Sequence, residues 1–214
     1  MEIIFLDKID STHKYLKNRI LTTGYTNPLA IVTSHQTNGI GSRDNNWYGT
    51  KGNLYFSFVL DKKILPNDLA LQSTSIYFSF ILKDLLKEEG SSVWLKWPND
   101  FYIDNKKIGG TITSISNGLF YCGIGINLKN ISNEYGSLDI KINQAEILNK
   151  YFNKIKEQKE WKQVFSKYLL EFEKSKLFKT TINNHKISLE NALLNEDGSI
   201  LIDNKKVYSL RWLK

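Results

Sequence analysis

The chain has 214 residues, which suffices for one sizeable domain with a buried core and a small appendage. A hydrophobic content of 41% with 13% aromatic residues excludes a chain that is disordered throughout. Twenty-nine Lys and Arg against 22 Asp and Glu give a net charge of +7. This charge favours anionic partners such as nucleotides, nucleic acid or an acidic protein, although lysines spread along the chain fit a compositional bias equally well.

Cysteine usage and hydropathy narrow the class further. Cys122 is the single cysteine, so the sequence excludes an intramolecular disulfide framework and a cysteine-based metal site. No apolar run approaches the roughly 20 residues of a membrane span. The first residues are acidic rather than basic and lack a small-residue cleavage site, unlike a signal peptide. We therefore expect a cytoplasmic protein without a membrane partner.

The first part of the chain reads as strands and one helix around a long loop. A Ser-Thr pair at residues 11 and 12 precedes a helical pattern and can cap it. Residues 34–51 lack periodicity and contain three glycines, which predicts a loop. The expected elements are a strand over 2–6, a helix over 13–20, and strands over 29–33 and 53–60.

The second part adds helices and then short strands. Pro66-Asn67-Asp68 is typical of a helix start, so we expect a helix from there to about residue 87. Strands are expected over 93–96, 100–103, 107–116 and 119–128, followed by amphipathic helices over 143–156 and 160–174. Beyond residue 178, short strands alternate with Asn and Gly turns. A β unit this small should dock on the main body rather than fold alone.

Residues 36–47 form the first segment that could carry chemistry. A long loop between two buried strands is uncommon unless it serves as a lid or a binding loop. Gly39 and Gly41 would let backbone amides approach an anion, and Arg43 adds donors suited to phosphate or carboxylate. Trp47 could stack on a base or another ring. Taken by itself, the segment fits a surface turn at least as well.

The second segment is Lys-Trp-Pro-Asn-Asp at 96–100, followed by Lys107-Ile-Gly-Gly110. Pro98 has no amide donor, so the strand must pause and turn there. If the strands on either side of residues 104–105 pair, Asp100 and Lys107 point a carboxylate and an ammonium at one site. The alternative is a hairpin with a solvent-exposed ion pair that contributes little to stability.

The third segment is Gly-Ile-Gly-Ile-Asn at 123–127, within an expected strand. Two glycines inside a strand indicate either a bulge or the close approach of a ligand or another backbone. The segment alone leaves both alternatives open.

Together these blocks resemble the catalytic module of biotin–protein ligases over residues 1 to about 130. The loop at 39–47, the blocks at 96–100 and 123–127, Lys107 with Gly110, and the Ser11-Thr12 pair follow the family's order and spacing. The loop departs from the family, because Ile40 and Ser42 stand where arginines are common and Asp44 replaces a glycine. His13 likewise replaces a common asparagine.

The resemblance implies an α+β fold, with a mixed sheet flanked by helices of the class II aminoacyl-tRNA synthetase and biotin synthetase type. It implies a catalytic domain over residues 1–178 and a small SH3-like β barrel over 179–214. The residues at 209–211 are similar to the barrel's last strand. Because the chain starts at the first catalytic strand, we expect neither the DNA-binding domain of some family members nor a repressor function or a DNA partner.

The implied reaction joins biotin and ATP into biotinyl-5′-AMP, with Mg²⁺ on the phosphates and no protein ligand predicted for the metal. A lysine of the biotin carboxyl carrier protein of acetyl-CoA carboxylase then accepts the biotin. The resemblance also allows a homodimer.

The resemblance further implies a role for each of the following residues. Catalytic roles fall to Lys107, Asp100 and Arg43; biotin binding to Ser11, Thr12, Gln36, Gly39, Ile40, Lys107 and Gly110; and ATP or adenylate binding to Arg43, Trp47, Asn99, Lys107 and Asn127.

Three alternatives stay open at this point. A lipoate–protein ligase shares the fold and the adenylate chemistry, although the Lys-Trp-Pro-Asn-Asp block favours biotin. A non-enzymatic nucleic-acid-binding domain would explain the positive charge but not Asp100, Lys107 and the ordered glycines. A protein that binds biotin without catalysis is suggested by the altered loop.

Overall fold

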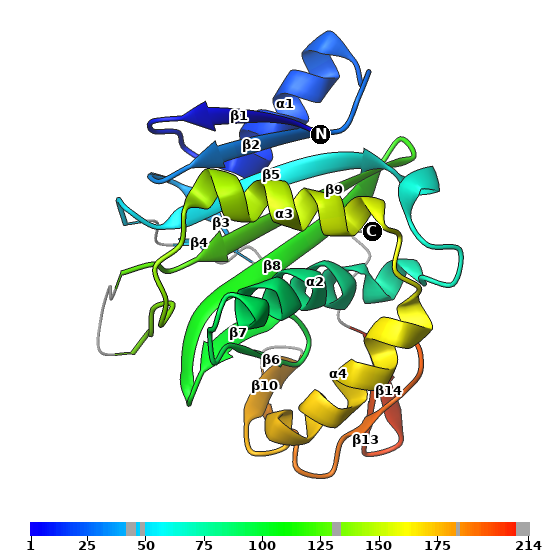
Figure 1. Ribbon diagram of the computed structural model, residues 1–214. Helices are drawn as coiled ribbons and strands as arrows, with labels where there is room; N and C mark the ends of the chain where they lie inside the picture. The colour runs from blue at the N-terminus through cyan, green and yellow to red at the C-terminus, as the bar shows by residue number, and fades with distance from the viewer. Residues whose placement is uncertain (42–45, 48–49, 130–133, 183–184, 209–214) are drawn as a thin grey trace.

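A computed structural model describes residues 1–41, 46–47, 50–129, 134–182 and 185–208. Within these residues, a seven-stranded mixed sheet forms the centre of the molecule (Figure 1). In spatial order its strands are β1 (Glu2–Leu6), β2 (Leu29–Thr33), β5 (Leu54–Asp61), β9 (Leu119–Ile126), β8 (Lys106–Ser116), β7 (Asp100–Ile103) and β6 (Trp94–Lys96).

The segments that connect the strands explain which pairs are parallel and which are antiparallel. β1 and β2 are parallel because α1 (Thr12–Thr23) joins them as a crossover, whereas the strands from β2 to β6 pair antiparallel. A tight turn at Asn117 and Gly118, both with positive φ, links β8 to β9. The strands predicted from hydrophobic runs are confirmed to within about two residues at their ends.

Helices cover both faces of this sheet. α2 (Thr74–Glu88) and α3 (Gln144–Lys156) lie in front of it in Figure 1, with α4 (Trp161–Ser175) against α2 and β6. α1 packs on the opposite face, where Leu16 and Ile20 contact Val59 of β5 and Tyr121 of β9. This arrangement confirms the expected mixed sheet flanked by helices. No helix in the described part of the chain is long and apolar enough to cross a membrane.

The predicted start of the second long helix was wrong. α2 begins at Thr74, after a 3₁₀ turn over Leu71–Ser73, and a separate 3₁₀ turn spans Lys62–Ile64. Asp68, which lies in the predicted helix start, instead accepts hydrogen bonds from the amides of Trp161 and Lys162 at 2.9 and 3.0 Å. It therefore caps α4, a helix that starts 93 residues later.

The loop at 34–51 contains a short hairpin that the sequence did not predict. β3 (Gly39–Ile40) pairs antiparallel with β4 (Asn46–Trp47). Gly39 is required at this crossing, because a Cβ there would lie 2.7 Å from Gln36 Nε2 and 2.8 Å from the carbonyl oxygen of Trp47. Two paired residues per strand are too few to produce a visible sequence period.

A small β unit follows α4, as predicted. Its contacts with the body include the turn at Asp197-Gly198: Ser73 Oγ donates to the Asp197 carbonyl at 2.5 Å, and Trp97 Nε1 to the Gly198 carbonyl at 2.9 Å. These contacts confirm docking and agree with an SH3-like unit, while the boundary at residue 178 stays a prediction. The unit comprises β10 (Lys179–Ile182), β11 (His185–Ser188), β12 (Leu193–Leu194), β13 (Ile200–Ile202) and β14 (Lys205–Val207).

Candidate active site

A pocket lies on the α1 face of the sheet, between the N-terminus of α1, the β3–β4 hairpin and strands β5, β7, β8 and β9. Its empty space is about 490 Å³, part of which is open to solvent. The lining residues are Ser11, Thr12, His13, Gln36, Ile40, Gly41, Trp47, Tyr55, Ser57, Asn99, Asp100, Lys107, Gly110, Thr111, Ile112, Gly123, Ile124 and Gly125.

Glycines of β9 form the floor of the pocket. The ladder between β5 and β9 runs without a register shift, so Gly123 and Gly125 do not mark a bulge. A Cβ at Gly125 would lie 3.2 Å from Cε2 of the Trp47 indole, and one at Gly123 would lie 3.0 Å from Ser57 Oγ. The glycines therefore serve the close approach of neighbouring groups, which decides between the two alternatives that the sequence left open.

An ion pair marks one end of the pocket. Lys107 Nζ lies 2.6 Å from Asp100 Oδ1, and the two side chains are 27% and 24% exposed. A register shift after Phe101 brings the two residues to one side of the β7–β8 hairpin, with Gly110 opposite Asp100. Lys107 Nζ also lies 5.7 Å from the centroid of the Trp47 ring. The pair is therefore accessible to a ligand, and its ammonium offers donors that suit an incoming anion as well as Asp100.

Neutral hydrogen-bonding groups line the other end. Gln36 Oε1 accepts from the Thr12 amide at 2.8 Å and from Thr12 Oγ1 at 3.0 Å. Thr12 Oγ1 lies 2.8 Å from Ser57 Oγ, and all three residues are buried. Ser11 Oγ caps α1 by accepting from the Lys14 amide at 3.4 Å, as its position in the sequence predicted. These contacts hold several donors and acceptors ready for a polar ligand.

His13 also lines this end, although the sequence marked it only as a departure from the family. Its side chain is buried, and Nε2 lies 3.4 Å from Ser114 Oγ. Burial, and to a smaller extent the charge of Lys17, lowers the pKa of His13 to about 4. The imidazole is therefore neutral near pH 7.

The remaining predicted residues divide into three groups. Asn99 lines the pocket, and its side-chain amide donates to the Thr111 carbonyl. Asn127 lies outside the lining and is buried; its Nδ2 donates to the Gly136 carbonyl at 3.2 Å, so it supports the segment behind β9. Gly39 supports the hairpin without lining the pocket. Arg43 and the 209–211 segment lie outside the described residues.

Tyr55 and Ser57 of β5 were missed. They alternate along a strand that reads as uniformly buried, so nothing local distinguishes the residues that face the pocket.

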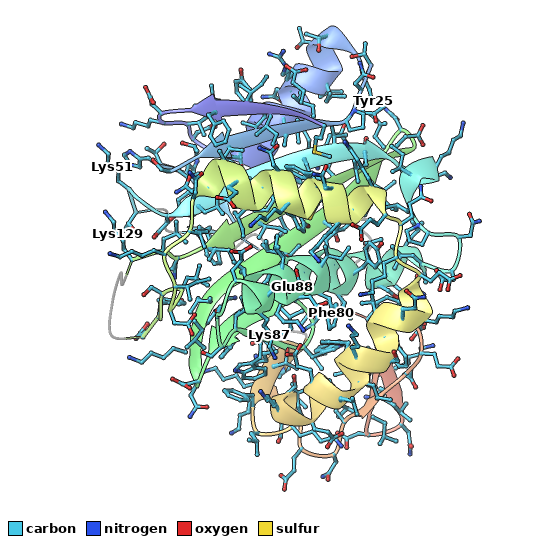
Figure 2. The ribbon with its side chains drawn as sticks, viewed as in Figure 1. Tyr25, Lys51, Phe80, Lys87, Glu88 and Lys129 are labelled. Atoms are coloured by element: carbon cyan, nitrogen blue, oxygen red, sulfur yellow. The ribbon has the colours of Figure 1, made fainter. Side chains whose placement is uncertain are left out.

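Lys51 and Lys129 extend from the same edge of the molecule, near the start of β5 and the end of β9 (Figure 2). Lys129 Nζ would lie 2.9 Å from a Cβ at Gly52, and both lysines are exposed. Two lysines therefore lie close together at this edge.

The pocket thus combines a Lys–Asp pair, a glycine floor and a buried polar end on one face of the sheet. Residues 5–130 match the biotin/lipoate A/B protein ligase family, and the chain belongs to this family. The bifunctional ligase/repressor BirA of Escherichia coli is 29% identical over 135 residues, covering 59% of this chain and 40% of that protein. The matches to the curated bacterial relatives thus span about two-fifths of their length.

Two solved structures extend the likeness to the whole chain. The biotin acetyl coenzyme A carboxylase synthetase of Helicobacter pylori, solved with bound biotinylated ATP, is 40% identical, with a TM-score of 0.92 over 97% of this chain and 99% of that one. The biotin protein ligase of Aquifex aeolicus, in complex with biotin and ATP, is 24% identical and shares the fold, with a TM-score of 0.74 over 98% and 96% of the chains. The fold implied by the sequence resemblance is confirmed.

Proposed function

We propose that the protein is a biotin–protein ligase that converts biotin and ATP to biotinyl-5′-AMP and transfers the biotinyl group to a carrier lysine. The pocket carries the proposal, because it joins the Lys107–Asp100 pair at one end to a buried, neutral hydrogen-bonding cluster at the other. Such a site suits a ligand with a carboxylate on one side and a polar ring on the other. The likeness to a synthetase that holds biotinylated ATP supports the same conclusion.

In the first step, a biotin carboxylate oxygen attacks the α-phosphorus of ATP. A new P–O bond forms, the bond to the β-phosphate oxygen breaks, and pyrophosphate leaves with the electron pair. The difficulty is that two anions must meet, so a cation between them stabilises the developing charge. Lys107 is the residue we assign to this role, because its ammonium lines the pocket and its partner Asp100 can release it.

In the second step, the carrier's lysine amine attacks the acyl carbon of the mixed anhydride. An amide bond forms, AMP leaves with the acyl–oxygen electron pair, and the attacking nitrogen loses a proton. We assign Asp100 to accept that proton or to hold the amine, since its carboxylate lies 2.6 Å from Lys107 Nζ at the open side of the pocket. The biotin carboxyl carrier of acetyl-CoA carboxylase is the proposed acceptor.

Biotin would be held by Ser11, Thr12, Gln36 and Ile40, with Gly110 allowing close approach. For the nucleotide, we assign Trp47 and Asn99, which line the pocket, and Arg43. Asn127 would act indirectly, through the segment that it supports. Mg²⁺ would enter as part of the MgATP substrate, held by phosphate oxygens and the waters that it retains.

Because the family also includes lipoate ligases, lipoate is the competing substrate. The polar cluster favours biotin, since a dithiolane ring offers no hydrogen-bonding partner for it. We propose a cytoplasmic location because ATP is a substrate. The repressor half of the name of the E. coli relative, and a DNA partner, are not part of the proposal.

The test is a labelling assay with purified components. The protein is incubated with MgATP, radiolabelled biotin or lipoate, and a purified biotin carboxyl carrier domain. We expect label in the carrier with biotin only, together with pyrophosphate release. A carrier whose acceptor lysine is replaced by arginine is the matched control and should stay unlabelled. Labelling by lipoate alone would favour the competing substrate, and no adenylate with either acid would overturn the proposed function.

A further inference from the structure

His13 presents a buried nitrogen to the pocket that no described residue satisfies. The side chain is 8% exposed, and Nδ1 has no hydrogen-bonding partner among the described residues. The other ring nitrogen, Nε2, faces Ser114 Oγ at 3.4 Å. Leaving a buried polar atom without a partner is costly, and such atoms are rare in native proteins. An atom of this kind in a pocket wall indicates a ligand that supplies the partner.

The position of Nδ1 is set by Gly123. A Cβ on Gly123 would lie 3.4 Å from His13 Nδ1 and 3.0 Å from Ser57 Oγ. Both polar atoms therefore lie close to the same point, just above the floor of the pocket. Ser57 Oγ is already linked to Thr12 Oγ1 at 2.8 Å, so the subsite continues the buried cluster that includes Gln36. The glycine keeps this point free for a ligand group.

The ring is held firmly and is uncharged. The ring of Tyr121 meets His13 edge-on, with centroids 6.4 Å apart, and Tyr121 packs with α1. Burial lowers the pKa of His13, and the nearby charge of Lys17 lowers it further. A neutral imidazole has one N–H donor and one acceptor nitrogen. Whichever tautomer Ser114 selects, Nδ1 can pair with a cyclic urea, which carries both N–H donors and a carbonyl acceptor.

We infer that His13 is a specificity-determining residue, whose Nδ1 hydrogen-bonds a polar ring group of the acid substrate in the subsite above Gly123. This inference rests on the proposed function and deepens it, because it selects a cyclic urea over an apolar ring. A dithiolane ring would leave Nδ1 buried without a partner, and sites that hydrogen-bond a substrate reject analogues lacking the group.

The subsite is separated from the reacting atoms. Gly110, beside the Asp100–Lys107 pair, lies opposite Gly125 on β9, whereas His13 faces Gly123. Two residues along a strand correspond to about 7 Å. His13 should therefore affect how tightly the acid binds and not how fast the bound acid reacts.

Two substitutions of similar size isolate Nδ1. His13→Asn keeps a polar atom near the Nδ1 position, whereas His13→Leu places a methyl group there, and both remove Nε2 and the rest of the ring. Direct calorimetric binding without ATP should show His13→Asn near the wild-type affinity for biotin. His13→Leu should bind biotin on the order of tenfold more weakly, the effect of one lost hydrogen bond. Its affinity for lipoate should be unchanged or higher.

Steady-state adenylate formation gives a second readout. For His13→Leu, KM for biotin should rise while kcat stays near the wild-type value. His185→Phe is the matched control, because His185 is exposed on β11 and should alter neither ligand's binding. Equal biotin affinity of the Asn and Leu variants, or equal loss of biotin and lipoate binding in both, would overturn the inference and make His13 a packing residue.

The wild-type protein provides a test that does not depend on a variant folding. The chain has three histidines, so the imidazole nitrogens can be assigned by ¹⁵N NMR. Adding biotin should move the Nδ1 resonance of His13, whereas lipoate should leave it in place. A wild-type protein that binds biotin without moving this resonance overturns the inference alone. A wild-type protein that binds no biotin overturns the proposed function with it.

Discussion

The two faces of the central sheet are built from alternate residues of the same strands, yet their compositions differ sharply. On the face covered by α2 and α3, β5 and β9 place Phe56, Phe58 and Phe120, all fully buried. Phe58 packs edge-on against Phe78 of α2, with ring centroids 5.1 Å apart. On the α1 face, the intervening positions carry Ser57, Gly123 and Gly125 at the pocket, beside Val59 and Tyr121, which pack on α1.

This contrast separates stability from binding within single strands. The aromatic face buries large apolar areas, and burial of that kind is the dominant favourable term in folding. On the α1 face, the glycines leave a pocket unfilled, and the polar atoms that line it can bind a ligand. A substitution should therefore change mainly stability on one face and mainly binding on the other. Substitutions on each face, together with a change of pH, test this division.

Lys107→Ala should lower the rate of adenylate formation on the order of a thousandfold while leaving the melting temperature nearly unchanged. The ammonium is partly exposed and pairs with one carboxylate, so little folding free energy depends on it. Pyrophosphate release and thermal unfolding measure the two effects. Lys106→Ala, at the exposed neighbouring position, is the control and should react normally. Near-normal pyrophosphate release by the Lys107 variant would remove that residue from the mechanism.

Phe58→Ala should lower stability and leave binding unchanged. Truncating this fully buried ring should reduce the free energy of unfolding by roughly 4 kcal/mol, because it removes apolar contacts and leaves a cavity. Urea unfolding measures the loss. At temperatures where the variant remains folded, its affinity for biotin should match the wild type, since Phe58 does not line the pocket. A large loss of affinity in the folded variant would show that the two faces are coupled.

The stability of the wild type should fall as pH drops from about 6.5 towards 4. His13 has a folded-state pKa of about 4, below the 6.5 of an unfolded chain. Between these values the unfolded state binds more protons, so stability is full above pH 6.5 and is lost on acidification, by roughly 3 kcal/mol in total. Urea unfolding of wild type and His13→Asn at pH 7 and pH 4.5 isolates this contribution. Parallel pH curves for the two proteins would refute it.

Gly125→Ala should have the smallest effect, confined to binding. Its methyl group would come within 3.2 Å of the Trp47 indole and push that ring from its place in the pocket. We expect about a tenfold weaker affinity for the adenylate, from the lost stacking. The unfolding free energy should change by less than about 1 kcal/mol, because the position faces the pocket and not the aromatic core. Unchanged affinity for the adenylate would show that the Trp47 ring can leave this position without weakening adenylate binding.

Local patterns predicted the parts of the fold that depend on neighbouring residues. The hairpin of β7 and β8 follows from the turn at 104–105, so the meeting of Asp100 and Lys107 was foreseeable. The short pairing of β3 with β4 was not, since it depends on the close packing of Gly39 against Trp47. The capping of α4 by Asp68 could not be predicted either, because the residues around Asp68 do not indicate that it contacts a helix that starts 93 residues later.

The family, the order of the main strands along the chain and the meeting of Asp100 with Lys107 could be predicted from the amino-acid sequence. These features lie in short blocks, whose turns and spacing act locally. The polar end of the pocket, by contrast, depends on contacts between residues far apart in the chain. Thr12 and Ser57 meet across 45 residues, and Nδ1 of His13 lies over Gly123 because α1 packs on one particular face of the sheet. Alternation along a strand defines two faces, but packing decides which of them becomes a core and which a site.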